Sequence, residues 1–330
     1  MSAAALPAAA MPESMPESMP ESMPESAQES IPEWAPADAA ERERQYSPSS
    51  CIGGDYRPFV TAYRARSEQA RAAAAALGGR WQRVSCGDSG HAPALELCLP
   101  AATAAARSVP LLLFVHGGYW QELSAADSLF AAPACIARRR AFAAVDYTLA
   151  PRARVSDIVD ECRLALAWLQ THGPALGIDA RAIVLAGSSA GAHLAAMMGP
   201  RAPCPPRAAL LVSGLYWLAP LVGTSINQAL ALDATEAAAL SPGLQPLAGS
   251  PPTHLVWGEV ETAAFKAQSR HFARALQAAG VPATTTEVAG RNHFDVVLDL
   301  SDPDSLLGAA LEHAFGEPEP GPEPEPEPDP

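Results

Sequence analysis

Residues 182–198 read AIVLAGSSAGAHLAAMM: an apolar run, a turn of small residues and an alanine-rich segment with helical character. The turn from Gly187 to Gly191 has the pattern GxSxG between a strand and a helix. This pattern indicates a nucleophilic serine only when a strand precedes it and a helix follows it. Glycine is needed at both ends, because side chains there would collide with the neighbouring strand and helix. The helix that follows also places the positive end of its dipole beside the Ser189 hydroxyl. The stretch therefore predicts a nucleophilic serine on a strand–turn–helix unit.

The same alternation continues on both sides of this unit and predicts the fold. Strand-like apolar runs occupy residues 95–99, 109–116, 141–145, 182–186, 208–213, 253–257 and 283–288. Segments of helical period occupy residues 56–77, 125–139, 156–171, 190–198, 262–279 and 304–315. Strands that alternate with helices are typical of βαβ units. We therefore expect an α/β fold with a mostly parallel central sheet and helices on both faces.

The two ends of the chain differ in composition from the segment between them. Residues 11–26 repeat MPES four times, and residues 317–330 alternate proline with acidic residues, so neither segment can bury an apolar core. We expect disordered tails at 1–43 and 317–330 on either side of one domain at 44–316. The formal charge of −14 is concentrated at the ends, with −7 in residues 1–45 and −6 in the last fourteen, so the body is nearly neutral.

Charge, hydropathy and motifs exclude several functional classes. A nearly neutral body lacks the basic surface with which proteins bind nucleic acids or anionic membranes. The sequence contains no apolar run of 18 residues, no secretory signal pattern and no CxxC pair among its six cysteines, so we expect a cytoplasmic protein with unpaired thiols. It has no metal-binding or nucleotide-binding motif, so we expect no metal, no cofactor and a small-molecule substrate. We leave open whether the chain is a monomer or a homodimer.

A second chemical motif, HGGYW at residues 116–120, follows the apolar run that ends at Val115. Two glycines directly after a central strand let the backbone amides turn toward a developing oxyanion. We predict that the donors are the amides of Gly117, Gly118 and Ala190, and that His116 braces the loop rather than acting as a base. Four aromatic residues are predicted to line the substrate pocket, with core packing as the alternative for each: Tyr119, Trp120, Tyr216 and Trp217.

A nucleophilic serine needs a base, and the base needs an acid that orients it. Among eight histidines, His293 fits best, because it follows the last strand-like run in a polar turn. Glu259 and Glu261 compete for the role of the acid, and the spacing of three residues past Gly258 favours Glu261. The order is then serine, acid and histidine, with gaps of 72 and 32 residues after Ser189 and Glu261, as in hydrolases with this turn.

Further segments of the chain carry a resemblance to a known family. They are RQYSPSS (44–50), AYRARSEQAR (62–71), HGGYW, DYTLAPRARVSDIVDECRLALAWL (146–169), AGSSAGAHLAAMM, LVSGLY (211–216), ALSP (239–242), GEVETAAFKAQS (258–269) and NHFDVV (292–297). Together they resemble the serine-dependent kynurenine formamidase (arylformamidase) family of α/β-hydrolases over residues 44–300. The resemblance implies hydrolysis of N-formyl-L-kynurenine to L-kynurenine and formate, a step of tryptophan degradation. Ser189, as the acylated nucleophile, Glu261 and His293 stand at the family's catalytic positions.

Two residues depart from the pattern of that family. Ser188 stands where members usually have histidine before the nucleophile, and Trp217 stands where aspartate is expected after LVSGLY. The second change would reshape the substrate pocket. Two alternatives therefore accompany the formamidase interpretation: a carboxylesterase for small aryl or acyl esters, and a noncatalytic binding protein with a hydrolase fold. The complete set of Ser189, Glu261 and His293 disfavours the noncatalytic alternative.

Overall fold

The computed structural model describes residues 32–87, 92–101 and 108–316, and its elements alternate along the chain. The strands are β1 (Arg80–Ser85), β2 (Ala94–Leu99), β3 (Val109–Val115), β4 (Ala141–Asp146), β5 (Ile178–Ser188), β6 (Ala208–Val212), β7 (Thr253–Val260) and β8 (Ala283–Asn292). The α-helices are α2 (Ala39–Gln45), α3 (Arg57–Ala76), α4 (Ala132–Ala137), α5 (Val155–His172), α6 (Ala190–Met198), α7 (Asn227–Leu230), α8 (Ala234–Ala239), α9 (Ala263–Ala278) and α10 (Leu306–Phe315). Short 3-10 helices are η1 (Pro48–Cys51), η2 (Ala125–Asp127), η3 (Gly173–Leu176), η4 (Gly199–Arg201), η5 (Ala219–Leu221), η6 (Pro242–Leu244) and η7 (Val296–Ser301).

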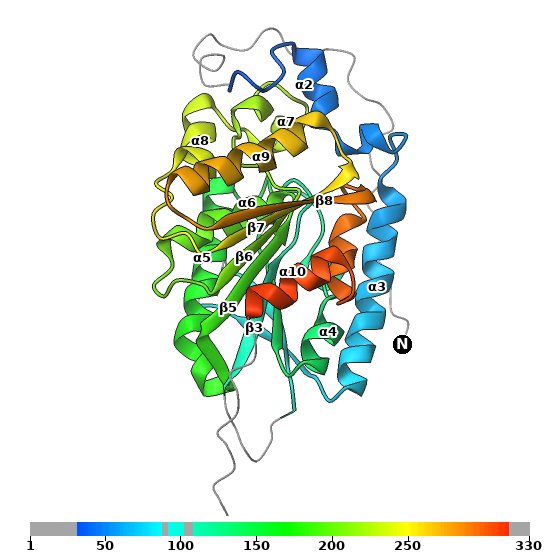
Figure 1. Ribbon diagram of the computed structural model, residues 1–330, viewed down its shortest axis with the longest axis vertical. Coiled ribbons are helices and arrows are strands. Elements are labelled where there is room, and N and C mark those ends of the chain that lie inside the picture. The colour runs from blue at the N-terminus through cyan, green and yellow to red at the C-terminus, as the bar shows by residue number, and fades with distance from the viewer. Residues whose placement is uncertain (1–31, 88–91, 102–107, 317–330) are drawn as a thin grey trace, which may run out of the picture.

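The strands of the described residues form one sheet in the order β1-β2-β4-β3-β5-β6-β7-β8 (Figure 1). β2 pairs antiparallel with β1 and β4, whereas all the other neighbours are parallel. The prediction of a mostly parallel sheet is therefore confirmed. Of these strands, β1 was not predicted. Its sequence RWQRVS is mostly polar and partly exposed, because an edge strand does not need to be apolar on both faces.

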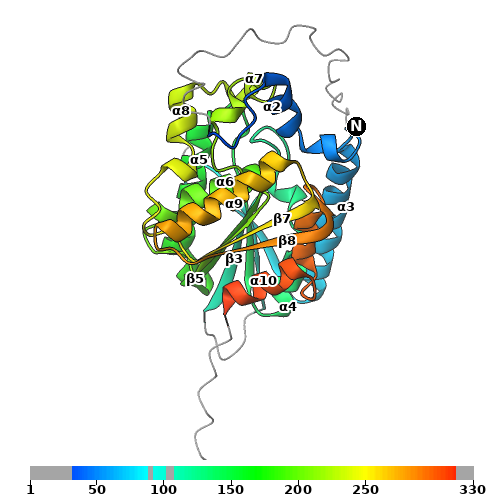
Figure 2. The ribbon, with the colours of Figure 1, turned by 45° about the horizontal axis from the view of Figure 1, so that its top comes forward.

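Helices cover both faces of the sheet, as the sequence predicted (Figures 1 and 2). Successive side chains of a strand point to opposite faces. Leu111 and Leu113 of β3 belong to a core cluster with residues of α5, α6 and α9. Leu112 and Phe114 belong to the opposite cluster, with residues of α3, α4 and α10. Because both faces are covered, the central strands are apolar along their length, which is why they were recognisable in the sequence.

The predicted helix at 125–139 is divided in the structure. η2 ends at Asp127, and α4 begins only at Ala132. Pro133 lies in the first turn of α4, where a residue without an amide hydrogen fits, so the helix starts there rather than earlier. The short helices α7 and α8 were not predicted. Each is shorter than two turns, so neither displays the periodicity on which the prediction depends.

The domain begins earlier than the sequence predicted. The parts of the two predicted tails at 1–31 and 317–330 lie outside the described residues. Residues 32–43, however, belong to the folded body: Trp34 stacks on His271 of α9 with 4.8 Å between ring centroids. The Asp38 side chain caps α2 by accepting the Glu41 amide at 2.9 Å. The boundary predicted at residue 43 was therefore wrong. The acidic repeats dominate the composition of residues 1–43, although this segment ends in the capped helix α2.

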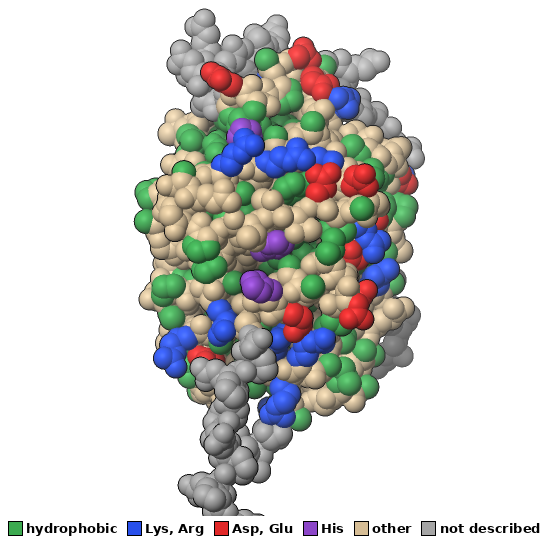
Figure 3. Space-filling model, in the orientation of Figure 1, with side chains coloured by type: hydrophobic (Ala, Val, Ile, Leu, Met, Phe, Trp, Pro, Cys, Tyr) green, Lys and Arg blue, Asp and Glu red, His purple; other side chains and the backbone are tan. Residues whose placement is uncertain are grey.

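The surface of the described part mixes charge types. Figure 3 shows Lys and Arg side chains interspersed with Asp and Glu among apolar side chains on this face. No helix in the described ranges combines the length and the apolarity needed to cross a membrane.

Candidate active site

Ser189 lies in a tight turn between β5 and α6. Its backbone has φ 56° and ψ −120°, a strained conformation that side chains rarely adopt. The two glycines of the motif permit this turn: a Cβ on Gly191 would lie 2.0 Å from the Val115 carbonyl oxygen, and a Cβ on Gly187 would lie 2.3 Å from the Gly191 oxygen. The Ser189 amide donates to the Val212 oxygen of β6 at 2.8 Å. The turn is thus fixed by its neighbours and places Ser189 in the wall of a pocket.

The HGGYW loop passes directly beside this serine. In the parallel pairing of β3 with β5, Val115 lies opposite Gly187, so the residues that follow each strand are adjacent. A Cβ on Gly117 would lie only 3.2 Å from the Ser189 Cβ. In the described part of the chain, the amides of Gly117 and Gly118 donate no backbone hydrogen bond. The Ala190 amide is in the first turn of α6 and has no acceptor within the helix. Among the described residues, the three amides predicted as oxyanion donors thus have no backbone acceptor, and Gly117 and Ala190 lie beside Ser189.

His293 and Glu261 form a buried pair. His293 Nδ1 lies 3.0 Å from Glu261 Oε2, and the side chains are 5% and 0% exposed. The other carboxylate oxygen accepts hydrogen bonds from Ser213 Oγ and from the Gly258 amide, both at 2.6 Å. Both oxygens of the carboxylate therefore accept hydrogen bonds from protein donors. A hydrogen on Nδ1 then leaves Nε2 of the imidazole as an acceptor toward the pocket that Ser189 also lines.

The competing carboxylate, Glu259, faces elsewhere. It is exposed, and its Oε2 accepts the Gly290 amide at 2.8 Å. β7 and β8 pair so that Val260 lies opposite Asn292, and Glu261 is therefore the residue level with the histidine that follows β8. Of the two carboxylates that the sequence left in competition, the structure places only Glu261 beside His293.

Two other histidines near Ser189 are buried and make local contacts. His116 Nδ1 lies 2.9 Å from the Gly117 oxygen, and its ring stacks on Tyr147 at 4.1 Å. His193 Nε2 lies 2.7 Å from the Leu240 oxygen. Burial lowers the pKa of His116 and of His193 to about 4, so both rings are neutral at pH 7. This geometry agrees with the expectation that His116 braces the loop.

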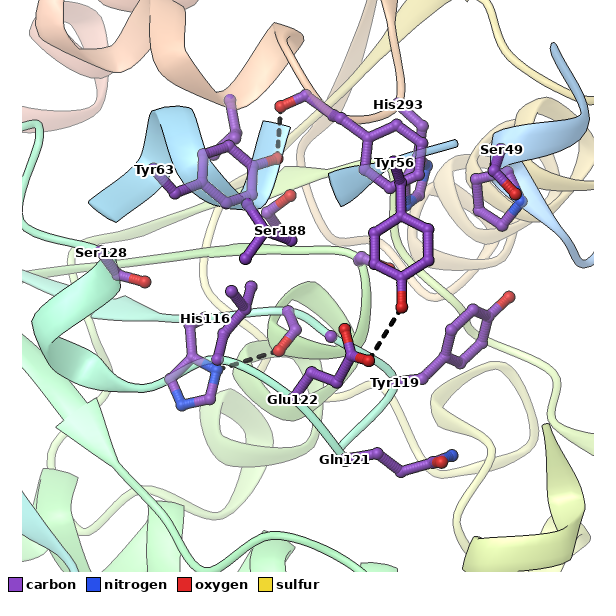
Figure 4. A pocket seen from close by; sticks show the side chains of 18 of the residues that line it. Ser49, Tyr56, Tyr63, His116, Tyr119, Gln121, Glu122, Ser128, Ser188 and His293 are labelled. Atoms are coloured by element: carbon purple, nitrogen blue, oxygen red, sulfur yellow. Dashed lines mark hydrogen bonds between the residues drawn. The ribbon is translucent and has the colours of Figure 1, made fainter. Parts of the chain in front are cut away.

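The pocket beside these residues has a volume of about 340 Å³, within the range of small-molecule sites (Figure 4). Its walls are mainly aromatic and apolar, and they come from α3, the HGGYW loop and the segment after β8. The lining residues include Tyr56, Val60, Tyr63, Phe114, Tyr119, Glu122, Phe130, Phe294 and Val297.

Of the four aromatic residues predicted to line the pocket, only Tyr119 does so. Trp120 is fully buried and meets His193 edge to face at 5.0 Å. Tyr216 stacks on Phe272 of α9 at 4.1 Å, in the core beneath that helix. Trp217 packs between Phe272 and Trp34. The prediction was wrong for these three, because the chain after each strand turns their side chains into the layer of α6 and α9.

Other residues form the pocket wall, and they were not predicted from the sequence. Tyr56, Val60 and Tyr63 recur at helical spacing along the start of α3, and all three line the pocket. The Tyr63 hydroxyl donates to the Phe294 oxygen, which ties α3 to the residue after His293. The apolar stripe on α3 was visible in the sequence. That it covers the catalytic loops depends on how α3 packs across the sheet, which a local pattern does not show.

The fold and this site define an α/β-hydrolase, an enzyme. A family model described as BD-FAE matches residues 95–203. Two curated relatives named kynurenine formamidase extend over nearly the whole domain: the protein from Salmo salar is 30% identical over 304 residues, and the protein from Danio rerio is 29% identical over 305 residues. Each match covers 86% of this chain and 99% of the relative. The chain belongs to the kynurenine formamidase family.

A solved structure agrees with this assignment of fold. A provisionally assigned thioesterase from Silicibacter sp. tm1040 superimposes with a TM-score of 0.70 at 28% identity. The superposition covers 82% of this chain and 98% of the other.

Proposed function

We propose that the chain hydrolyses N-formyl-L-kynurenine to L-kynurenine and formate, with Ser189 as the nucleophile. The observation that carries the proposal is the buried pair of His293 and Glu261, 3.0 Å apart, at a pocket that Ser189 also lines. An aryl formamide matches the shape of this site. Its acyl group is a single carbon that fits beside the small residues of the oxyanion loop, and its leaving group is an aromatic amine that fits an aromatic wall.

The reaction proceeds in two steps. His293 Nε2 takes the hydroxyl proton of Ser189 while the oxygen attacks the formyl carbon, and the oxyanion faces the amides of Gly117, Gly118 and Ala190. Collapse of the tetrahedral intermediate breaks the carbon–nitrogen bond. The imidazolium then gives its proton to the departing amine, which leaves a formyl ester on Ser189. Water attacks this ester with His293 again as the base, and formate leaves as Ser189 recovers its proton.

The surroundings of His293 suit this role. Glu261 holds Nδ1–H and stabilises the imidazolium, so that Nε2 is the atom that exchanges protons. The ring of Phe265 meets the imidazole edge to face at 4.5 Å, and Phe294 meets it at 5.3 Å. These contacts restrict the rotation of the ring that Glu261 holds, so that little reorientation is needed during the reaction.

The first test compares the two substrate classes. We expect kcat/KM for N-formyl-L-kynurenine to exceed that for p-nitrophenyl acetate, and Ser189→Ala to lower kcat on both substrates by at least about 10⁴-fold. Turnover of the ester alone would reject the formamidase and favour the carboxylesterase, the alternative that shares this site. Wild-type activity in Ser189→Ala would reject Ser189 as the nucleophile.

The adjacent serines provide a matched control for this assignment. A fluorophosphonate reacts covalently with an activated serine, and intact-mass measurement counts the adducts. We expect one adduct on the wild type and on Ser188→Ala, and none on Ser189→Ala. An adduct that survives Ser189→Ala would place the activated hydroxyl elsewhere.

We also propose a cytoplasmic location. All six cysteines lie in the described residues and are unpaired, which favours a reducing compartment. The interspersed charges visible in Figure 3 support a small-molecule substrate rather than nucleic acid as the partner.

A further inference from the structure

Glu122 is the carboxylate of the substrate pocket, and the mechanism above does not use it. It lies directly beyond the oxyanion loop: its amide donates to the Gly118 oxygen at 3.0 Å, and a Cβ on Gly118 would lie 3.1 Å from the Glu122 Cβ. Figure 4 shows its side chain reaching across the pocket toward Tyr56. Glu122 is therefore both close to the reacting centre and directed into the space that a substrate occupies.

The charge of Glu122 has no cationic partner within the described residues. None of the ion pairs formed there includes it, and the described lining of the pocket contains no Lys or Arg. Its side-chain partner in the described residues is the Tyr56 hydroxyl, which donates to Oε1 at 2.8 Å. Burial and the hydrogen bond to Glu122 raise the pKa of Tyr56 to about 12, so this hydroxyl stays protonated. A neutral donor fixes one carboxylate oxygen and leaves the negative charge uncompensated.

The aromatic wall links Glu122 to the catalytic histidine. The Tyr56 ring stacks on Phe294 with 5.9 Å between centroids and 11° between planes, and Phe294 directly follows His293. A flat aryl group lying along this wall has one end at His293 and the other at the Tyr56 hydroxyl, which holds Glu122. In an ortho-substituted aryl formamide, the substituent is bonded to the ring carbon next to the one that carries the formyl nitrogen, so an ammonium on that substituent reaches Glu122 through the length of the side chain that carries it.

We propose that the Glu122 carboxylate, oriented by Tyr56, binds the ammonium group of an amino-acid substituent on the aryl formamide and so selects zwitterionic substrates over neutral aryl formamides and esters. The inference rests on the proposed function, because it assigns the part of the substrate distant from the formyl group. Of the functional groups of N-formyl-L-kynurenine, its ammonium is the one that complements an unpaired anion, and charge-assisted hydrogen bonds are the stronger kind. Glu122 is a binding residue here and takes no part in proton transfer.

The test compares N-formyl-L-kynurenine with its deaminated analogue, 4-(2-formamidophenyl)-4-oxobutanoate, which differs in the ammonium group alone. We expect the ratio of their kcat/KM values to favour the amino acid in the wild type and to fall by about 10- to 100-fold in Glu122→Gln. Glu68→Gln, an exposed carboxylate on α3, is the matched control and should keep the wild-type ratio. Tyr56→Phe should lower the ratio less than Glu122→Gln, because it removes the orienting hydroxyl and keeps the charge.

The ratio of kcat/KM values compares two substrates on the same protein. Partial unfolding of a variant lowers both values equally and therefore leaves the ratio unchanged. A ratio near one in the wild type, or an unchanged ratio in Glu122→Gln, would overturn the inference while leaving the formamidase proposal intact. If the wild type hydrolyses p-nitrophenyl acetate and neither formamide, the proposed function fails. The inference is then judged by inhibition of ester hydrolysis: L-kynurenine should inhibit more strongly than its deaminated analogue, and equal inhibition constants would overturn it.

Discussion

At the scale of single residues, the proposed mechanism depends on the surroundings of Glu261. The side chain of Glu261 is fully buried. Its carboxylate accepts hydrogen bonds from Ser213, Gly258 and His293. Burial of a charge costs free energy that hydrogen bonds reduce, and these three donors are in place before any substrate binds. The imidazolium that forms during the reaction therefore finds its counter-ion already in place.

We predict that Glu261→Gln lowers kcat by about 10³- to 10⁴-fold, because a neutral amide no longer stabilises the imidazolium and can favour the wrong tautomer of His293. Glu259→Gln, two residues earlier and at the end of β7, should change kcat by no more than about twofold, since its side chain is exposed and its hydrogen bond within the described residues is to the Gly290 amide. Steady-state kinetics with thermal melting of both variants separates catalysis from stability. A larger loss in Glu259→Gln would exchange the roles of the two carboxylates.

The proposed catalytic residues, which the structure places around one pocket, each carry a signal of their own in the sequence. Ser189 lies in a motif with the right flanks, and His293 and Glu261 follow strands in the order that hydrolases use. Ser213 directly follows β6, in LVSGLY, but its hydrogen bond to Glu261 depends on the position of β6 between β5 and β7. Such a partner is fixed by sheet order, and sheet order is a non-local property of the fold.

At the scale of elements, the segment from α2 to η1 connects the loops of the site. We call residues 39–51 the N-terminal strap. The Gln45 oxygen accepts the Thr262 hydroxyl at 2.6 Å, and Gln45 Oε1 accepts the Ala264 amide at 3.0 Å. The Tyr46 oxygen accepts the Tyr119 hydroxyl at 2.5 Å. The strap thus joins the residue after Glu261 to the residue after the oxyanion glycines.

We predict that Gln45→Ala lowers the free energy of unfolding by about 1–3 kcal/mol, because it leaves the buried Ala264 amide without an acceptor. It should also lower kcat several-fold, because the first turn of α9 and the acid loop before it lose a fixed point. Gln69→Ala, on the exposed side of α3, is the control and should stay within about 0.5 kcal/mol of the wild type. Urea unfolding and kinetics measure the two effects, and equal stability of both variants would contradict a supporting role for Gln45.

The strap also shows why element boundaries were harder to predict than the central strands. β3 and β5 are apolar runs covered on both faces, so their sequences identify them directly. The strap is short and polar, and it is held by hydrogen bonds to residues 73, 217 and 219 positions away. Nothing in the sequence around Tyr46 shows that this tyrosine is fully buried.

At the scale of the whole molecule, two neutral histidines in the interior make stability depend on pH. His116 and His193 are fully buried with pKa values of about 4 in the folded protein, against an ordinary value of 6.5. Above pH 6.5 both states of the chain hold these rings neutral, so their contribution to folding is complete. As the pH falls toward 4, the unfolded chain binds protons that the folded chain cannot accept. Stability is therefore lost on the acid side of this window.

We predict a loss of about 2 kcal/mol for each of these histidines between pH 7 and pH 5, measured as the free energy of urea unfolding. His193→Gln removes one titrating ring and retains an amide donor for the Leu240 oxygen, so the stability that it loses over the same interval should be smaller than the wild-type loss by about 2 kcal/mol. His172→Gln, at an exposed ring on α5, serves as the control and should keep the wild-type slope. Carboxylate protonation contributes equally to all three proteins, because none of the substitutions removes an acid. A slope in His193→Gln equal to that of the wild type would mean that the folded protein accepts a proton on His193 well above pH 4.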